Sequence, residues 1–195
     1  RSKNGVGCRS RLSCRIGDEM EKYTINLAGL KRDLKLCPLD DKIDIAAFIM
    51  FSDVELTIKS AEELIKKAPD CHVILTAESK GIPLAYEMSR QLGIPYVVAR
   101  KSVKLYMTNV VSVEVKSITT SSVQTLYLDC DKAELLKGKR VLIVDDVIST
   151  GESLRALEKL TESADGIIVG KAAVLAEGDA ADRKDIIFLE KLPLF

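Results

Sequence analysis

Apolar residues recur at the spacing of an amphipathic helix in three segments, residues 53–68, 82–92 and 151–164. In the first segment, Asp53 precedes the apolar periodicity as a candidate N-cap, and Pro69 follows the segment. The pattern therefore predicts three helices, each with one buried face.

Short apolar runs alternate with these helices, and each is bounded by polar or turn-forming residues. They are residues 72–76, 96–99, 140–144 and 167–174. Strands that are apolar on both faces are typical of a parallel sheet covered by helices on both sides. In such sheets ligands bind beyond the carboxyl ends of the strands. We therefore expect an α/β fold with its chemistry in the loops after Thr76, Ala99 and Val144.

Composition and charge indicate an ordinary globular domain and exclude several functions. The chain has 195 residues, 47% hydrophobic and 30% charged, and its longest uncharged stretch, residues 117–128, is too short to span a membrane. Its 29 basic residues balance 29 acidic ones, so no net positive field favours nucleic acid. We expect residues 20–195 to form a single domain, with no nucleic-acid or membrane partner.

The first nineteen residues differ from the rest of the chain. They hold five basic and two acidic residues without an apolar core, so they do not form a secretory signal. We interpret residues 1–19 as a non-native or leader segment, with a transit peptide as the alternative and Met20 as the natural start. The five cysteines of the chain are scattered and odd in number, which favours free thiols and a cytoplasmic location.

Residues 141–153 carry the most specific chemistry. An apolar strand leads to Asp145 and Asp146, and a turn of small residues, 149–151, then opens a helix. Hydroxyl and backbone N–H groups at a helix N-terminus bind phosphate. Carboxylates accept hydrogen bonds from sugar hydroxyls or hold Mg²⁺ through water. The stretch therefore suits a sugar phosphate, although a solvated strand end followed by a simple helix cap is the alternative.

Two other nucleotide-binding motifs are incomplete. A P-loop requires G-x-x-x-x-G-K-[ST], and Gly138-Lys139 lacks both the first glycine and the hydroxyl. The pair Gly5 and Gly7 lies in the leader segment and follows no predicted strand. The sequence therefore does not favour a nucleotide-hydrolysing P-loop enzyme or a dinucleotide-binding protein.

Residues 141–153 resemble the phosphoribosyl-diphosphate (PRPP) binding motif of type I phosphoribosyltransferases at all thirteen positions. The resemblance extends over about residues 73–176. It implies a parallel sheet flanked by helices, a flexible β-hairpin loop, and a small hood made from the N- and C-terminal segments. It further implies that Asp145 and Asp146 bind the ribose hydroxyls and, through water, Mg²⁺. The 5′-phosphate would be held by Ser149, Thr150, Gly151, Glu152 and Ser153.

Two further loops agree with this family. Residues 76–81 follow a strand where the family keeps its pyrophosphate loop, often with a cis non-proline peptide. The implied pyrophosphate contacts are Glu78, Ser79 and Lys80. Residues 100–105 lead into two runs of high strand propensity, 106–115 and 123–128, and resemble the start of the mobile catalytic hairpin. The implied catalytic cations are Arg100, Lys101 and Lys104, with a solvated charge cluster as the alternative.

The acceptor base is less clearly indicated. Residues 80–86 resemble adenine and xanthine phosphoribosyltransferases, and also the effector domain of the Gram-positive purine repressor. Ser149 stands where hypoxanthine-guanine enzymes carry an aspartate. Residues 192–195 resemble the Pro-x-Phe end of adenine enzymes, whereas 117–122 occupy the place of their hairpin glutamate. We expect adenine, with a xanthine/guanine-type enzyme as the alternative. The hood, residues 23–51, and the strand end offer Arg32, Asp33 and Val147 as base contacts.

The resemblance implies a pentosyltransferase of purine salvage. It would transfer the phosphoribosyl group of PRPP to a purine, with Mg²⁺ as cofactor and pyrophosphate as product. The family further implies a homodimer. A PRPP-sensing regulator without catalysis is the rival class, although the roughly fifty residues ahead of Pro69 are fewer than the roughly 70 of a winged-helix domain.

Overall fold

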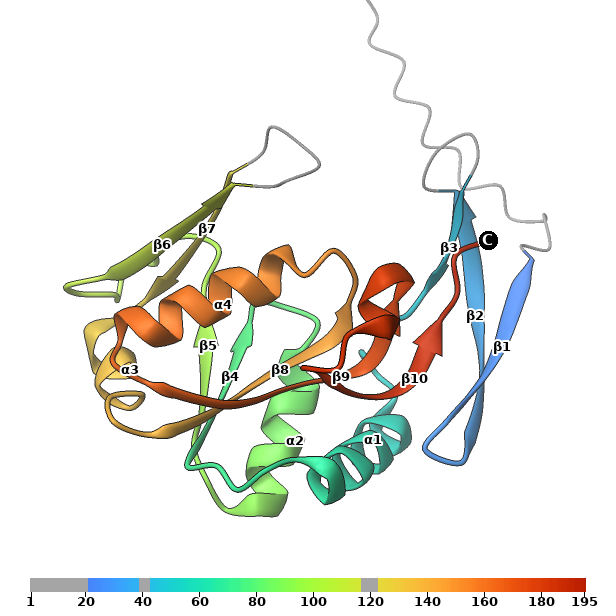
Figure 1. Cartoon of the computed structure of the whole chain (residues 1–195), viewed down its shortest axis with the longest axis horizontal. Coiled ribbons are helices and arrows are strands. Elements are labelled where there is room, and N and C mark those ends of the chain that lie inside the picture. Colours follow the sequence, from blue (N-terminus) through green and yellow to red (C-terminus); the bar gives the residue numbers. More distant parts are fainter. Residues whose placement is uncertain (1–20, 39–42, 117–122) are drawn as a thin grey trace, which may run out of the picture.

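The computed structural model describes residues 21–38, 43–116 and 123–195. The leader segment 1–19 and the hairpin tip 117–122 therefore lie outside the described residues. The centre of the molecule is a five-stranded parallel sheet in the order β10-β9-β8-β4-β5 (Figure 1). Its strands are β4 (Val73–Ala77), β5 (Tyr96–Ala99), β8 (Arg140–Ile148), β9 (Ile167–Glu177) and β10 (Ile187–Leu192). The predicted α/β fold is confirmed.

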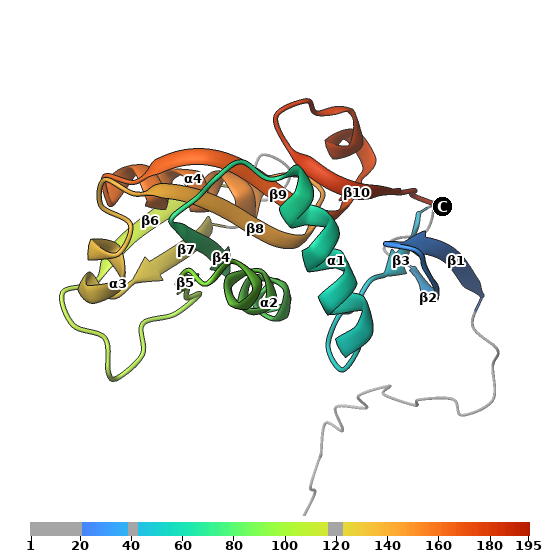
Figure 2. The ribbon, with the colours of Figure 1, turned by 90° about the horizontal axis from the view of Figure 1, so that it is seen from below.

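Helices cover both faces of this sheet (Figure 2). They are α1 (Val54–Lys67), α2 (Ile82–Leu92), α3 (Cys130–Glu134), α4 (Glu152–Ser163) and the 3₁₀ helix η1 (Gly178–Asp182). Because side chains alternate along a strand, Val141 and Ile143 pack beneath α4, whereas Leu142 and Val144 pack against α1 and α2. In the described part of the chain, no helix is long and apolar enough to cross a membrane.

A second, antiparallel sheet forms the hood. Its strands are β1 (Lys22–Leu27), β2 (Leu30–Pro38) and β3 (Asp44–Ala47), in that order. The C-terminal residues join it, because Asp44 and Phe195 exchange backbone hydrogen bonds of 2.8 and 3.0 Å. The expected hood of N- and C-terminal segments is therefore present, at one end of the central sheet (Figure 1).

The predicted hairpin lies at the opposite end of the molecule. Strands β6 (Val111–Lys116) and β7 (Val123–Leu128) pair antiparallel, and the bridge between Arg100 and Tyr127 ties them to the end of β5. The first strand begins later than predicted, because residues 101–110 form an irregular loop in which Tyr106 is exposed.

Strand β8 is longer than predicted. The prediction ended it at Val144, but it continues to Ile148 and pairs with β9 as far as Ala176. The two aspartates therefore lie within a paired strand and not in the loop after it. Because a strand sends successive side chains to opposite faces, Asp145 and Asp146 have different surroundings.

Candidate functional site

Three sequence segments of predicted chemistry meet at the carboxyl ends of neighbouring parallel strands. Residues 76–81 include the end of β4, residues 100–105 follow β5, and residues 149–153 follow β8. Because β8, β4 and β5 are adjacent in the sheet, their loops share one edge. This edge is the candidate active site.

Asp146 is buried and short of hydrogen-bond donors, and Asp145 beside it is partly buried. Asp146 is 6% exposed, and its Oδ2 has no hydrogen-bond partner among the described residues, with Lys80 Nζ 3.9 Å away. The backbone N–H of Asp146 donates to Oδ1 of Asp145 over 2.9 Å. Burial, and then the charge of Asp146, raises the pKa of Asp145 to about 8.

Such a pair favours the approach of hydroxyl donors or a cation. The described residues hold no cluster of three metal-ligating side chains. The unpartnered buried oxygen of Asp146 and the carboxylate beside it nevertheless fit a hydrated Mg²⁺ ion, whose water ligands would donate hydrogen bonds to them. Asp145 and Asp146 are the residues that would hold it.

Gly81 allows the loop after β4 to approach the acidic pair. A Cβ built on Gly81 would lie 2.6 Å from Thr76 Oγ1 and 2.9 Å from Asp145 Oδ1. Any side chain there would therefore displace the aspartate or the loop. Thr76 Oγ1 is itself buried without a partner among the described residues, so polar atoms gather at this contact.

The predicted pyrophosphate and catalytic loops are in contact through Glu78. Its carboxylate accepts from the backbone N–H of Lys101 over 3.1 Å and lies 3.7 Å from Arg100 and 3.9 Å from Lys104. These contacts, the Lys101 N–H first, lower the pKa of Glu78. In this structure the Glu78 side chain pairs with groups of the neighbouring loop, and its role as a pyrophosphate contact stays a prediction. The Glu78–Ser79 peptide is cis, as the resemblance led us to expect.

The predicted phosphate loop, residues 149–153, opens helix α4. Gly151 adopts a left-handed conformation with φ +75°, which favours glycine at this turn. Residues 147–154, together with Asp145, line a small cavity of about 40 Å³. Ser153 donates to Gln124 of β7 over 3.4 Å, so the hairpin packs beside this loop. The five predicted 5′-phosphate residues are therefore gathered around one cavity.

A larger cavity of about 280 Å³ separates the acidic pair from the hood. Residues 45–49 of β3 and the following segment form its hood side, and Asp146 and Val147 lie on the sheet side. Val147 therefore lies beside this cavity, and its contact with the base stays a prediction.

The structure does not bring Arg32 and Asp33 to this cavity. Arg32 donates to Asp53 over 2.6 Å and to Glu55 over 2.9 Å at the start of α1. Asp33 accepts from Thr24 Oγ1 over 2.7 Å on the exposed side of the hood. Neither side chain therefore contacts the cavity in which we expected them.

Glu177 lines the hood cavity, and sequence reasoning missed it. It is the last residue of β9, and burial raises its pKa, against the opposing effect of Lys80. No motif marks this residue. The available signal was the parallel pairing of β9 with β8, which brings the ends of the two strands to the same edge.

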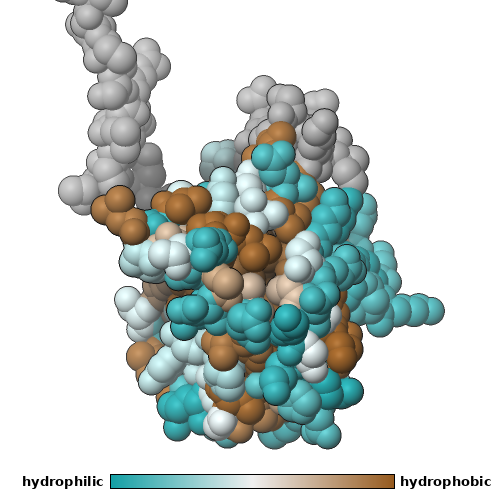
Figure 3. Space-filling model, turned by 90° about the vertical axis from the view of Figure 1, so that its left-hand side faces the viewer, coloured by the Kyte–Doolittle hydropathy of each residue, from teal (hydrophilic) through white to brown (hydrophobic). Residues whose placement is uncertain are grey.

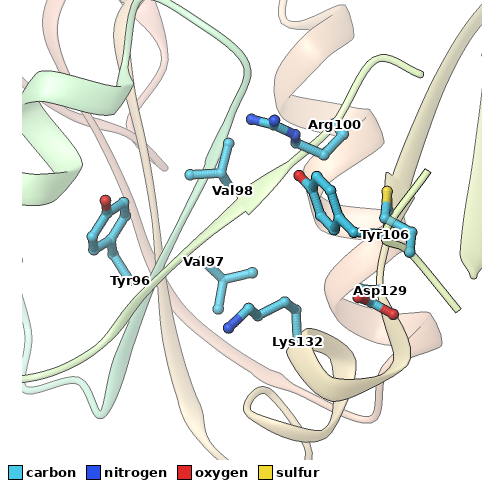
Figure 4. A pocket seen from close by; sticks show the side chains of 8 residues that line it. Tyr96, Val97, Val98, Arg100, Tyr106, Asp129 and Lys132 are labelled. Carbon is cyan, nitrogen blue, oxygen red and sulfur yellow. The ribbon is translucent and has the colours of Figure 1, made fainter. Parts of the chain in front are cut away.

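A third cavity, of about 380 Å³, lies beside edge strand β5 (Figure 4). Its walls come from β5, the following loop and α3, and they include Tyr96, Arg100, Tyr106 and Lys132. Arg100 therefore faces both this cavity and, through Nη1, Glu78. The cavity does not include the acidic pair.

Several known proteins are similar to this chain in sequence and in fold. The model of the phosphoribosyl transferase domain family matches residues 53–192. The chain is 36% identical over 147 residues to a hypoxanthine/guanine phosphoribosyltransferase of Methanococcus voltae, covering 75% of this chain and 72% of that protein. It is 33% identical over 137 residues to an adenine phosphoribosyltransferase of Brachyspira hyodysenteriae, covering 70% and 74%.

A solved structure agrees with these relatives. The crystal structure of adenine phosphoribosyltransferase from Thermoanaerobacter pseudethanolicus superposes with a TM-score of 0.67 at 27% identity, covering 81% of this chain and 95% of that one. The fold and site thus define a type I phosphoribosyltransferase. The chain belongs to the phosphoribosyl transferase domain family, and the prediction of a pentosyltransferase is confirmed.

Proposed function

We propose that the protein transfers the phosphoribosyl group of PRPP to a purine base in a Mg²⁺-dependent reaction that releases pyrophosphate. The observation that carries the proposal is the pair of partly buried Asp145 and buried Asp146, set between the phosphate loop 149–153 and a loop of cations. Each part suits one section of PRPP. The phosphate loop can bind the 5′-phosphate, and the aspartates can accept hydrogen bonds from the ribose hydroxyls. The cations can pair with the pyrophosphate.

The reaction breaks the bond between ribose C1 and the pyrophosphate oxygen, and the pyrophosphate keeps the electron pair. A ring nitrogen of the base forms the new bond to C1, and the proton of its N–H passes to the released pyrophosphate. Positive charge grows on the ribose and negative charge on the leaving group, so catalysis relies on position and electrostatics. Asp145 and Asp146 orient the ribose, and Lys80, Arg100 and Lys104 stabilise the leaving group.

Bound Mg²⁺ would neutralise charge on the pyrophosphate, and Asp145 and Asp146 would hold it through water. The cations near Glu78 are already collected on one side of the site. Pyrophosphate can replace the carboxylate of Glu78 as their partner, because a phosphate oxygen accepts the same hydrogen bonds. Closure of the hairpin would exclude water, which otherwise hydrolyses PRPP.

The hood cavity is the proposed base site, with Val147 against the ring and Glu177 accepting hydrogen bonds from it. Adenine is the first candidate, since its exocyclic amine gives the donor that a carboxylate requires. Hypoxanthine or guanine is the second, because the relative from Methanococcus voltae bears that name at 36% identity. A ring N–H of these bases would also suit Glu177.

The test measures pyrophosphate release from PRPP and Mg²⁺ with adenine, hypoxanthine, guanine, xanthine and orotate in turn. Pyrophosphate release with adenine supports the full proposal. Release with another purine supports the reaction but shows that the proposed base is wrong. If no base causes pyrophosphate release, and calorimetry shows tight binding of PRPP, the result would favour the rival function of a PRPP-sensing regulator. Release with orotate alone would overturn the choice of a purine.

A cytoplasmic homodimer completes the proposal. The face in Figure 3 carries hydrophobic side chains at the surface. The loop after β5 exposes Val103, Leu105 and Tyr106, and Tyr106 also lines the cavity of Figure 4. Exposed apolar side chains gathered on one loop are typical of an interface. The free thiols of Cys37, Cys71 and Cys130 agree with a reducing compartment.

A further inference from the structure

Arg183 lies against the apex of the phosphate loop, although it comes from a distant part of the chain. It follows η1, thirty-two residues after Gly151. A Cβ built on Gly151 would lie 2.9 Å from Nη1 of Arg183, and no other atom comes within 4 Å. The guanidinium is therefore the group that covers this side of the loop.

The orientation of Arg183 is fixed by a network of ion pairs. Its Nε and Nη2 donate to the two carboxylate oxygens of Asp185 over 2.9 and 2.7 Å. Lys171 of β9 donates to Asp185 over 2.6 Å and to Glu158 of α4 over 2.7 Å. This bidentate pairing uses one edge of the guanidinium and turns Nη1 toward the loop. Within the described residues, Nη1 has no hydrogen-bond partner of its own.

A phosphate bound at residues 149–153 would need a nearby cation to balance its negative charge. The loop supplies hydroxyl and backbone N–H groups, but its one ionisable side chain, Glu152, is acidic. Asp145 lines the same cavity. None of the side chains of residues 149–153 is basic, so a phosphate dianion placed there takes its neutralising charge from another segment. Arg155 also reaches the loop, but its Nη2 donates to the carbonyl oxygen of Thr150 over 3.2 Å.

We propose that Arg183 is a further binding residue for the 5′-phosphate of the substrate, and that Asp185 and Lys171 are the positioning residues that direct it. Nη1 donates to a phosphate oxygen and supplies the charge that the loop lacks. The ligand class is a phosphomonoester on a pentose. This inference rests on the proposed function, because PRPP is what brings such a phosphate to the loop.

The test is calorimetric binding of ribose 5-phosphate to the full chain, with pyrophosphate as a second ligand. A hydrogen bond to a charged group is worth a factor of about ten to a hundred in affinity, so Arg183→Gln should raise the Kd for ribose 5-phosphate by that factor. The Kd for pyrophosphate should stay within about twofold of its wild-type value. Arg183→Lys keeps the charge and should recover part of the loss.

Two matched variants separate binding from structure. Asp185→Asn keeps Arg183 but loosens its orientation, so an intermediate loss is expected. Lys191→Gln removes a cation that pairs over 3.4 Å with Asp182 of the same segment, and it should leave both affinities unchanged. Circular dichroism of each variant establishes that the chain is folded before binding is compared.

The outcomes are distinct. Wild-type affinity of Arg183→Gln for ribose 5-phosphate would overturn the inference, and so would an equal loss for pyrophosphate, which indicates general damage. If the wild-type chain releases no pyrophosphate with any base but binds ribose 5-phosphate, the proposed function is wrong. The affinities of wild type and Arg183→Gln for ribose 5-phosphate still test the role of Arg183. A wild-type chain without affinity for ribose 5-phosphate overturns both.

Discussion

Substitution of Gly81 by alanine tests the close contact between the pyrophosphate loop and the acidic pair. Gly81 has helical backbone angles, so alanine causes no backbone strain there and would even reduce the freedom of the unfolded chain. The added Cβ would lie 2.6 Å from Thr76 Oγ1 and 2.9 Å from Asp145 Oδ1, whereas ordinary contacts begin at 3.4 Å. The neighbours must therefore move by up to roughly 0.8 Å.

A shift of this size should affect catalysis more than stability. Overpacking costs about 1–3 kcal/mol of the free energy of unfolding. A misplacement near 1 Å in an active site costs about a hundredfold in rate. We expect Gly81→Ala to remain folded at 25 °C and to lose about a hundredfold in kcat/KM for PRPP, measured by base-dependent pyrophosphate release.

Gly93→Ala is the matched control. A Cβ at Gly93 would meet no atom within 4 Å, but its φ of +68° penalises alanine. This variant should lose about 1 kcal/mol of stability and keep its turnover. Wild-type kcat/KM in folded Gly81→Ala, or equal losses of activity in the two variants, would refute the argument from close approach.

Three further predictions address the hood, the base site and the interface. Arg32→Gln should leave the KM for the base unchanged. Because Arg32 lowers the pKa of Asp53, the stability that this carboxylate contributes is present above its unfolded pKa and is lost as pH falls through the lower folded value. The variant should therefore show a weaker acid dependence in urea unfolding below about pH 5. Glu177→Gln should raise the KM for the base about tenfold and leave the KM for PRPP unchanged in steady-state kinetics; a change confined to PRPP would contradict this role. Leu105→Asp, at a side chain fully exposed in the single chain, should yield a folded monomer in sedimentation, and a persistent dimer would exclude this loop from the interface.

The local parts of the site could be predicted because their residues are contiguous. Residues 141–153 contain the acidic pair and the phosphate loop in one run, and the helix cap of Asp53 forms as its position indicated, accepting from the N–H of Leu56 over 3.1 Å. Such features depend on a few neighbouring residues. The extension of β8 to Ile148 could not be predicted in this way, because it depends on pairing with β9.

The parts that were missed depend on tertiary placement. Glu177 and Arg183 carry no motif, and only the parallel pairing of β9 with β8 brings their segment to the active edge. Arg32 was placed in the base site because the hood was expected there. Its side chain instead binds Asp53 and Glu55, since the start of α1 offers two carboxylates within reach.

The most direct test of the central claim compares the wild-type chain with Asp146→Asn in base-dependent pyrophosphate release from PRPP and Mg²⁺. The substitution keeps the size of a side chain that is 6% exposed and removes its charge. We predict release by the wild type, a loss of at least about a hundredfold in the variant, and an unchanged circular dichroism spectrum. Turnover of Asp146→Asn at the wild-type rate would contradict the assignment of the acidic pair to the reacting ribose.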